Sequence, residues 1–168
     1  MNYMIALFII IPPGQEPAPS PGDKVLEYAR SMVGKQVGNG QCTDLVANAL
    51  EQAGARRRTA DGWGEPVEKL DEVLPGDILI FEDAVFVRRR RSRSGAFTST
   101  TARMGNHAAI VSDVRNQRGS TLLAILHQNI RNNETGEVRQ EVHEWFLNLS
   151  ELRGGTVRAY RPVAPDAS

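Results

Sequence analysis

One cysteine and three histidines are the residues of this 168-residue sequence best suited to covalent chemistry. Cys42 lies between a glycine-rich turn at 38–41 and an amphipathic helical pattern at 43–52. Thr43 and Asp44 suit the first turn of a helix, because their side-chain oxygens can accept from free backbone N–H groups. We therefore expect Cys42 at a helix N-terminus, where the helix dipole favours the nucleophilic thiolate. The alternative is a buried structural thiol, since free cysteine is among the most buried residue types.

A cysteine nucleophile needs a base that takes its proton and a third group that orients the base. His107 precedes the apolar run 108–111 and His127 follows the apolar run 122–126, so both histidines are expected at strand ends. Because alternate residues of a strand share a face, His127 and Asn129 are both candidates for the third group. For either histidine the alternative is a hydrogen-bonded structural role.

Two glutamines near the cysteine are candidates for binding the oxyanion. Gln36 lies in the loop before the turn, and Gln41 directly precedes Cys42. Either amide, together with the Cys42 backbone N–H, can donate to an oxyanion that develops on the substrate. The sequence does not choose between the two glutamines.

The spacing of these residues does not indicate a metal site. No Cys-x-x-Cys or His-x-x-x-His pair occurs in the sequence, and such close pairs are typical of zinc sites. We therefore expect no metal and no other cofactor. His143 has charged neighbours in an alternating pattern, so its side chain is expected to be exposed.

The elements that would position these residues indicate an α+β fold. Helical periodicity marks two segments near the N-terminus, and turn residues at 75–77 introduce the first of about five strands. Helices followed by strands are typical of helices packed on one side of an antiparallel sheet. The expected helices are 23–33 and 43–52, and the expected strands are 78–81 (extended by or paired with 85–87), 108–114, 122–126, 138–146 and 156–160.

Four short motifs occur in a fixed order along the chain: 41–43 around the cysteine, 75–77, 106–111 around His107, and 127–129. In this order they resemble the CHAP family of cysteine, histidine-dependent amidohydrolases and peptidases and, more broadly, the NlpC-type branch of papain-like hydrolases. The resemblance covers about residues 23–162. It implies a papain-like fold in which Cys42 attacks an amide carbonyl, His107 acts first as base and then as acid, and the substrate is peptidoglycan or a related peptide.

The third position departs from the pattern of the CHAP family, which often has an acidic residue where this chain has His127. A neutral histidine can accept a hydrogen bond from His107 and orient it, but it stabilises an imidazolium less than a carboxylate does. NlpC-type relatives often have a histidine at this position. Asn129 matches the asparagine of papain-like enzymes, so the triad is expected to be Cys-His-His or Cys-His-Asn.

Charge gives a second hypothesis about partners. The 20 basic residues balance the 20 acidic ones, so a nucleic-acid partner is not expected from net charge. Arginines concentrate at 88–93, which we expect to form a solvated loop between two strands. Such a run can also bind an anionic polymer through charge alone. A papain-like binding module without turnover, for cell wall or another anionic polymer, is therefore the alternative to an enzyme.

The ends of the chain are expected to lie outside the single domain at 23–162. Residues 1–22 combine an apolar run at 4–11 with a proline-rich linker, and 163–168 form a tail. The apolar run is too short to span a bilayer, and as a secretory signal it lacks a basic start and an Ala-x-Ala site. A docked strand or helix, or a misassigned start codon, are the alternatives. We expect a monomer without a membrane span, in which the lone cysteine forms no internal disulfide.

Overall fold

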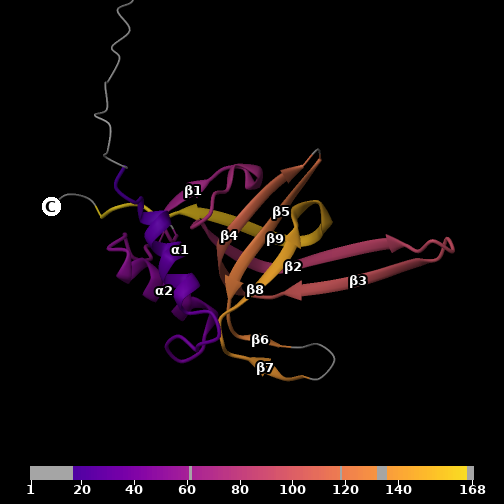
Figure 1. The fold of residues 1–168 in the computed structure, drawn as a ribbon, viewed down its shortest axis with the longest axis horizontal. Helices are drawn as coiled ribbons and strands as arrows, with labels where there is room; N and C mark the ends of the chain where they lie inside the picture. The colour runs from indigo at the N-terminus through magenta and orange to yellow at the C-terminus, as the bar shows by residue number, and fades with distance from the viewer. Residues whose placement is uncertain (1–16, 61, 118, 132–135, 166–168) are drawn as a thin grey trace, which may run out of the picture.

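The chain folds into two helices packed against one side of an antiparallel sheet (Figure 1). The computed structural model describes residues 17–60, 62–117, 119–131 and 136–165. The helices are α1 (Pro21–Ser31) and α2 (Cys42–Gln52), and short 3-10 turns lie at Leu70–Glu72 and Leu149–Glu151. The strands are β1 (Glu65–Val67), β2 (Ile78–Arg91), β3 (Phe97–Met104), β4 (His107–Gln117), β5 (Ser120–His127), β6 (Ile130–Arg131), β7 (Val138–Arg139), β8 (His143–Asn148) and β9 (Leu152–Arg161).

The main sheet has seven strands in the order β1-β9-β2-β4-β5-β8, and β3 pairs with the second half of β2. All of these pairs are antiparallel, and β6 and β7 form a separate two-stranded sheet. The α+β architecture with the helices first is therefore as predicted. The sheet has more strands than the expected five, because β1 and β3 are short or strongly polar and gave no apolar pattern.

Local sequence explains both helices. In α1 the Ser20 hydroxyl accepts from Asp23 N, and the Asp23 carboxylate accepts from Ser20 N, so the helix begins at Pro21 rather than near Asp23. In α2 the Asp44 carboxylate accepts from the N–H groups of Asn39 and Gln41, which fixes the glycine turn onto the first helical turn. Both helices bury one apolar face; in α2 this face is formed by Leu45, Val46, Ala49 and Leu50.

Strand alternation divides the interior into two apolar clusters, one on each face of the sheet. In β4, Ala108 and Ile110 belong to the cluster beneath the helices, whereas Ala109 and Val111 belong to the cluster on the opposite face. The second cluster also contains Phe81, Phe86, Met104, Leu123, Ile125 and Leu147. Both faces of the central strands are therefore shielded from solvent, which is consistent with their nearly continuous apolar sequences.

Arginines 88–91 belong to a strand and not to a loop, so that expectation is wrong for them, whereas Arg93 lies in the turn. Residues 88–91 continue β2 and pair in register with 97–100 of β3. Ser92 N donates to Ala96 O, and Gly95 takes a φ of 87°, a conformation that suits glycine in the tight turn. The charges are compatible with this strand because both of its faces are exposed near the turn.

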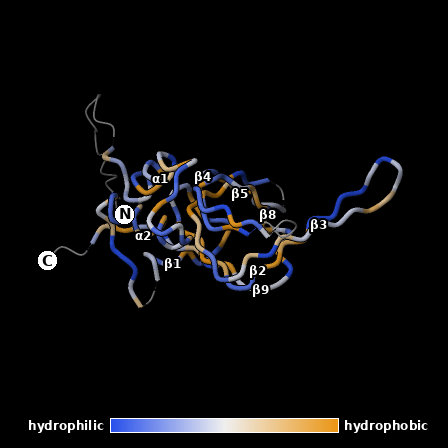
Figure 2. Tube along the Cα trace, turned by 90° about the horizontal axis from the view of Figure 1, so that it is seen from below, coloured by the Kyte–Doolittle hydropathy of each residue, from blue (hydrophilic) through white to orange (hydrophobic). Residues whose placement is uncertain are grey.

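We call residues 84–104 the hairpin arm. It extends away from the body of the molecule, and most of the hydrophobic stretches lie in the body (Figures 1 and 2). Pairing of β2 with β9 ends at Phe86, so residues 87–91 pair only with β3. Near its tip the exposed ring of Phe97 lies beneath the Arg91 guanidinium, 5.5 Å from it.

The expected strand at 138–146 is interrupted. Val138 and Arg139 belong to β7, and β8 begins at His143, because the backbone of Val142 bonds to the loop after α1 instead of to a neighbouring strand. The expectations for the apolar run at 4–11 concern residues outside the described part of the chain. Neither helix of the described ranges has the length and apolar character needed to cross a membrane.

Candidate active site

Cys42 is the first residue of α2, as the sequence predicts, and its side chain is 9% exposed. The turn before it needs left-handed backbone conformations, with φ of 57° at Gly38 and 80° at Gly40. A Cβ at Gly38 would lie 2.8 Å from the Asp44 carboxylate, so the glycine also makes room for the side chain that holds the turn. The sequence around Cys42 therefore fixes the start of the helix in one position.

Gln128 holds the same turn from the opposite side. Its side chain is fully buried and forms two hydrogen bonds with the backbone of Val37, accepting from N at 3.0 Å and donating to O at 2.9 Å. It also donates to the carbonyl oxygen of Gln41 at 2.7 Å. One amide thus ties the end of β5 to the residue directly before Cys42. No local sequence pattern indicates this contact, because its partners lie 87 and 91 residues away.

His107 and His127 form a buried pair at adjacent strand ends. His107 begins β4 and His127 ends β5, and the register that pairs Ile110 with Leu126 makes the two histidines diagonal neighbours on one face. Nε2 of His107 lies 3.0 Å from Nδ1 of His127, within hydrogen-bond distance. The side chains are 7% and 0% exposed. The sheet therefore joins two of the residues that the sequence singles out.

A role of His107 as base requires one particular arrangement of protons on the two rings. If His107 is to accept a proton at Nδ1, its Nε2 must carry a hydrogen and donate to Nδ1 of His127. Neutral His127 then carries its own hydrogen on Nε2. That atom is buried and is the only buried side-chain nitrogen or oxygen of the described residues without a partner.

Burial lowers the pKa of both histidines. The pKa of His107 falls from 6.5 to about 4, mainly through desolvation and to a lesser degree through the charge of His143. Desolvation also lowers the pKa of His127, with the charges of His107, His143 and Arg139 adding to the effect. Both rings are therefore neutral near pH 7, in the protonation state required of a base.

Aromatic contacts support His127 on its remaining sides. Its ring stacks on Trp145, with centroids 5.7 Å apart and planes 11° apart. The ring of His143 lies 4.4 Å away from it, centroid to centroid, and Nδ1 of His143 lies 3.1 Å from Glu141 O. The expectation that His143 is simply exposed is therefore wrong, since the β5–β8 pairing places it beside His127 and half buries it.

Cys42 and His107 line one cavity of about 320 Å³, between the start of α2 and the central strands β2 and β4. Arg58 and Trp63 form part of its wall, with the guanidinium 5.2 Å from the centre of the ring. Arg58 and Trp63 belong to no motif that indicates chemistry, so the sequence does not predict this part of the wall. The other residues of the lining are Thr43, Ile80, Phe81, Glu82, Asn106 and Ala108.

The remaining candidates are not part of the lining of this cavity. Asn129 has a φ of 64°, so β5 ends before it and strand alternation does not extend to it; its amide donates to Gln41 Oε1 at 3.1 Å. Gln36 donates to Gly38 O at 3.4 Å. Thus His127 contacts His107, and Asn129 contacts Gln41. Across the described ranges, no three metal-binding side chains gather into a group.

The comparison with protein families gives one match over most of the chain. The model of the AIM3/BBC1 cysteine proteinase-fold domain matches residues 17–167. Together with the two helices and the antiparallel sheet, this match establishes a papain-like cysteine proteinase fold. A search of curated proteins and a search of solved structures found no match.

Proposed function

The chain belongs to the AIM3/BBC1 cysteine proteinase-fold domain family, and from this premise we propose that it is a cysteine-dependent hydrolase of amide bonds. Cys42 is the nucleophile, His107 is the base and then the acid, and His127 is the group that orients His107. The position of Cys42 at the start of α2 supports the role of nucleophile. The hydrogen bond between His107 and His127 supports the roles of base and orienting group. The cysteine proteinase fold is consistent with all three roles.

One observation carries the proposal: the hydrogen bond between the histidines uses Nε2 of His107. The other ring nitrogen, Nδ1, therefore remains available on a residue that lines the same cavity as Cys42. A catalytic histidine needs this division, with one nitrogen held by an orienting group and the other free to exchange a proton with the nucleophile.

The proposed reaction has two halves. Nδ1 of His107 takes the proton of Cys42, and the sulfur attacks the amide carbonyl to form a tetrahedral oxyanion. The C–N bond breaks as His107 returns the proton to the leaving amine, which leaves a thioester. Water then attacks the thioester, with His107 taking one proton and returning it to the sulfur, so that the acid product and the free thiol are formed.

The oxyanion donors are the backbone N–H of Cys42 and the side-chain amide of Gln41. Gln36 is the weaker candidate because its amide nitrogen already donates to Gly38 O. In Gln41 the oxygen accepts from Asn129, which fixes the amide in place and leaves its NH₂ group without a partner among the described residues. The helix N-terminus adds its dipole at the same point.

We propose a peptide amide as the substrate, and a peptidoglycan peptide as the first one to test. The site supports an amide as the bond that is cut, because a thiol and a neutral imidazole that line one cavity of about 320 Å³ are suited to attack on a carbonyl carbon. The choice of peptidoglycan, and of CHAP- or NlpC-type chemistry, rests on the order of the sequence motifs.

The test is hydrolysis of fluorogenic peptide amides and of peptidoglycan fragments by the wild type and by Cys42→Ala. The wild type should release amine with turnover, and Cys42→Ala should release none above background while unfolding at nearly the same temperature, since the side chain lost is small. A second measurement is the rate at which iodoacetamide alkylates Cys42 at pH 7. This rate should be higher in the folded protein than in the unfolded chain. Hydrolysis that persists in Cys42→Ala would remove the nucleophile assignment.

A binding module without turnover is the second candidate. The observation in its favour is that the Cys42 thiol forms no hydrogen bond to His107 among the described residues, while His107 has a neutral and not an acidic partner. Under this alternative the wild type and Cys42→Ala would bind the same peptides equally well, and neither would cut them.

A further inference from the structure

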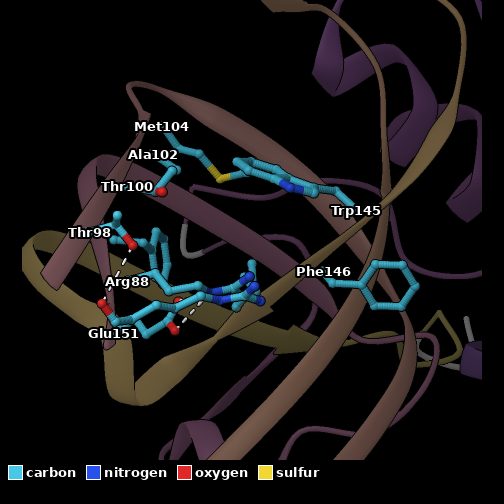
Figure 3. A pocket seen from close by; sticks show the side chains of 11 residues that line it. Arg88, Thr98, Thr100, Ala102, Met104, Trp145, Phe146 and Glu151 are labelled. Carbon is cyan, nitrogen blue, oxygen red and sulfur yellow. Dashed lines mark hydrogen bonds and ion pairs between the residues drawn. The ribbon is translucent and has the colours of Figure 1, made fainter. Parts of the chain in front are cut away.

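A second cavity, of about 480 Å³, lies between the hairpin arm and β8, and its lining includes neither Cys42 nor His107 (Figure 3). Even-numbered residues of β2 and β3 line one side of it, because alternate side chains of the arm share a face. Residues 145–147 of β8 and Glu151 line the other side. Its volume lies in the range of small-molecule sites.

The inner part of this cavity is apolar. Phe86, Met104 and Leu147 are 5%, 2% and 5% exposed and close the end that meets the core. The Met104 side chain points to the ring of Trp145, which forms part of the wall (Figure 3). This end of the cavity therefore suits a hydrocarbon or aromatic group.

The outer part of the cavity carries one unbalanced positive charge. Nε of Arg88 bonds to both carboxylate oxygens of Glu151, at 2.9 and 3.2 Å, so these two charges compensate one another. Arg90 lies two residues further along the same face, and no acidic side chain among the described residues pairs with it. Thr98 and Thr100 add hydroxyl groups opposite the arginines.

We propose that this cavity binds a small monoanion with an apolar body, of the kind represented by a medium-chain fatty carboxylate. The apolar body packs against Trp145, Met104 and Phe86, and the anionic group is held by Arg90. Among the described residues that line the cavity, Arg90 is the one cation without an acidic partner, and together with the apolar floor it fits one negative charge on an apolar molecule. A polyanion, by contrast, would be bound by the whole arm, including arginines that face away from the cavity.

Trp145 reports occupancy of this cavity, since it lines the wall and also stacks on His127. The chain has two tryptophans, so replacing Trp63 by Phe leaves Trp145 as the single indole fluorophore. The experiment titrates full-length Cys42→Ala/Trp63→Phe with octanoate, 1-octanol and acetate and follows Trp145 fluorescence. Since this protein lacks the proposed nucleophile, binding is measured independently of hydrolysis.

We expect octanoate to give a saturable change, 1-octanol to bind about tenfold more weakly, and acetate to give no change. Arg90→Gln should weaken octanoate about tenfold and leave 1-octanol unaffected. The matched control is Arg89→Gln, which removes the neighbouring charge from the opposite face of the arm and should leave octanoate affinity unchanged. No saturation with octanoate, or equal losses in Arg89→Gln and Arg90→Gln, would overturn the proposal.

An effect on catalysis is a separate measurement that rests on the proposed function. Because Trp145 supports the ring of His127, octanoate should change the turnover of wild-type protein and should change that of Arg90→Gln only at about tenfold higher concentration. Saturable fluorescence without hydrolysis would keep the ligand site and reject the enzyme.

Discussion

The two halves of β2 have different environments within one continuous strand. Residues 78–81 lie between β4 and β9, are almost completely buried, and include Phe81, which pairs with His107. Residues 88–91 pair only with β3 and are largely exposed. Backbone pairing is regular in both halves, so pairing alone does not determine how much a side chain contributes to the free energy of unfolding. We expect side-chain burial and the hydrogen bonds of buried groups to determine this contribution.

Among the buried polar side chains, the largest loss of stability should come from Gln128, at the buried end of the sheet. Gln128→Leu leaves the N–H of Val37 without a partner, and the carbonyls of Val37 and Gln41 each lose one of two donors, since they also accept from Gly40 N and Asp44 N. A buried N–H left unpaired costs about 1–3 kcal/mol, and the two lost carbonyl bonds add to this cost, so the free energy of unfolding should fall by about 2 kcal/mol or more. Urea unfolding measures this difference.

The adjacent residue gives the matched control. Asn129 makes one exposed hydrogen bond, and glycine is the suitable replacement because its φ is 64°. Asn129→Gly should lower the free energy of unfolding by less than about 1 kcal/mol. Equal losses in the two variants would mean that the Gln128 contacts are not what stabilises the turn before Cys42.

These two neighbours also indicate what sequence can predict here. The position of Cys42 at a helix start and of the two histidines at strand ends follows from local spacing, and local spacing is present in the sequence. The contacts of Gln128 join residues 87 and 91 positions apart, and no local pattern encodes them. The alternation argument for Asn129 failed for a local reason, since one residue in the left-handed region ended the strand.

The prediction of a loop at the hairpin arm is wrong because charge does not determine backbone pairing. A run of arginines argues against burial, and the arm agrees with that part of the prediction. It does not argue against strand pairing, since an exposed two-stranded arm leaves every charge in solvent. The cavity beside the arm could not be predicted, because it depends on how the distant strand β8 lies against the face of Arg88 and Arg90.

At the buried histidine pair we predict a large effect on turnover. His127→Ala removes the hydrogen bond to Nε2 of His107 and should lower turnover about 100-fold, the equivalent of about 2.7 kcal/mol. His127→Glu should retain turnover or raise it, because a carboxylate stabilises the imidazolium. Asn129→Gly should cost less than His127→Ala. Turnover at saturating peptide, corrected for folded protein, tests the ranking, and the reverse order would transfer the orienting role to Asn129.

The pH dependence of stability should also come from the buried end. The pKa of His107 is about 4 in the folded protein and about 6.5 in an unfolded chain, so between these values the unfolded chain binds the proton more strongly. The stabilisation is complete above pH 6.5 and is lost as the pH falls toward 4, by about 1.4 kcal/mol per pH unit. His127, whose pKa is also lowered, contributes in the same direction.

His107→Gln provides the comparison for this pH effect, because glutamine keeps polar atoms near His127 but does not titrate. Urea unfolding at pH 7, 6 and 5 should show a shallower decline of the unfolding free energy in the variant than in the wild type. The same decline in both proteins would mean that other groups cause it.

The smallest effect should come from the exposed half of β2. Within the described part of the chain Arg89 forms no ion pair, and it lies on the face of the arm away from the cavity. Its strand pairs in register with β3, and its side chain extends into solvent. Threonine favours strands, so Arg89→Thr should change the free energy of unfolding by less than about 0.5 kcal/mol.

In the buried half of the same strand, Leu79→Ala should lower the free energy of unfolding by about 2–5 kcal/mol, because the side chain removed is fully buried. Urea unfolding of both variants tests the contrast directly. A loss in Arg89→Thr as large as that in Leu79→Ala would mean that the arm is part of the cooperative core, and that exposure along β2 does not determine how much each residue contributes.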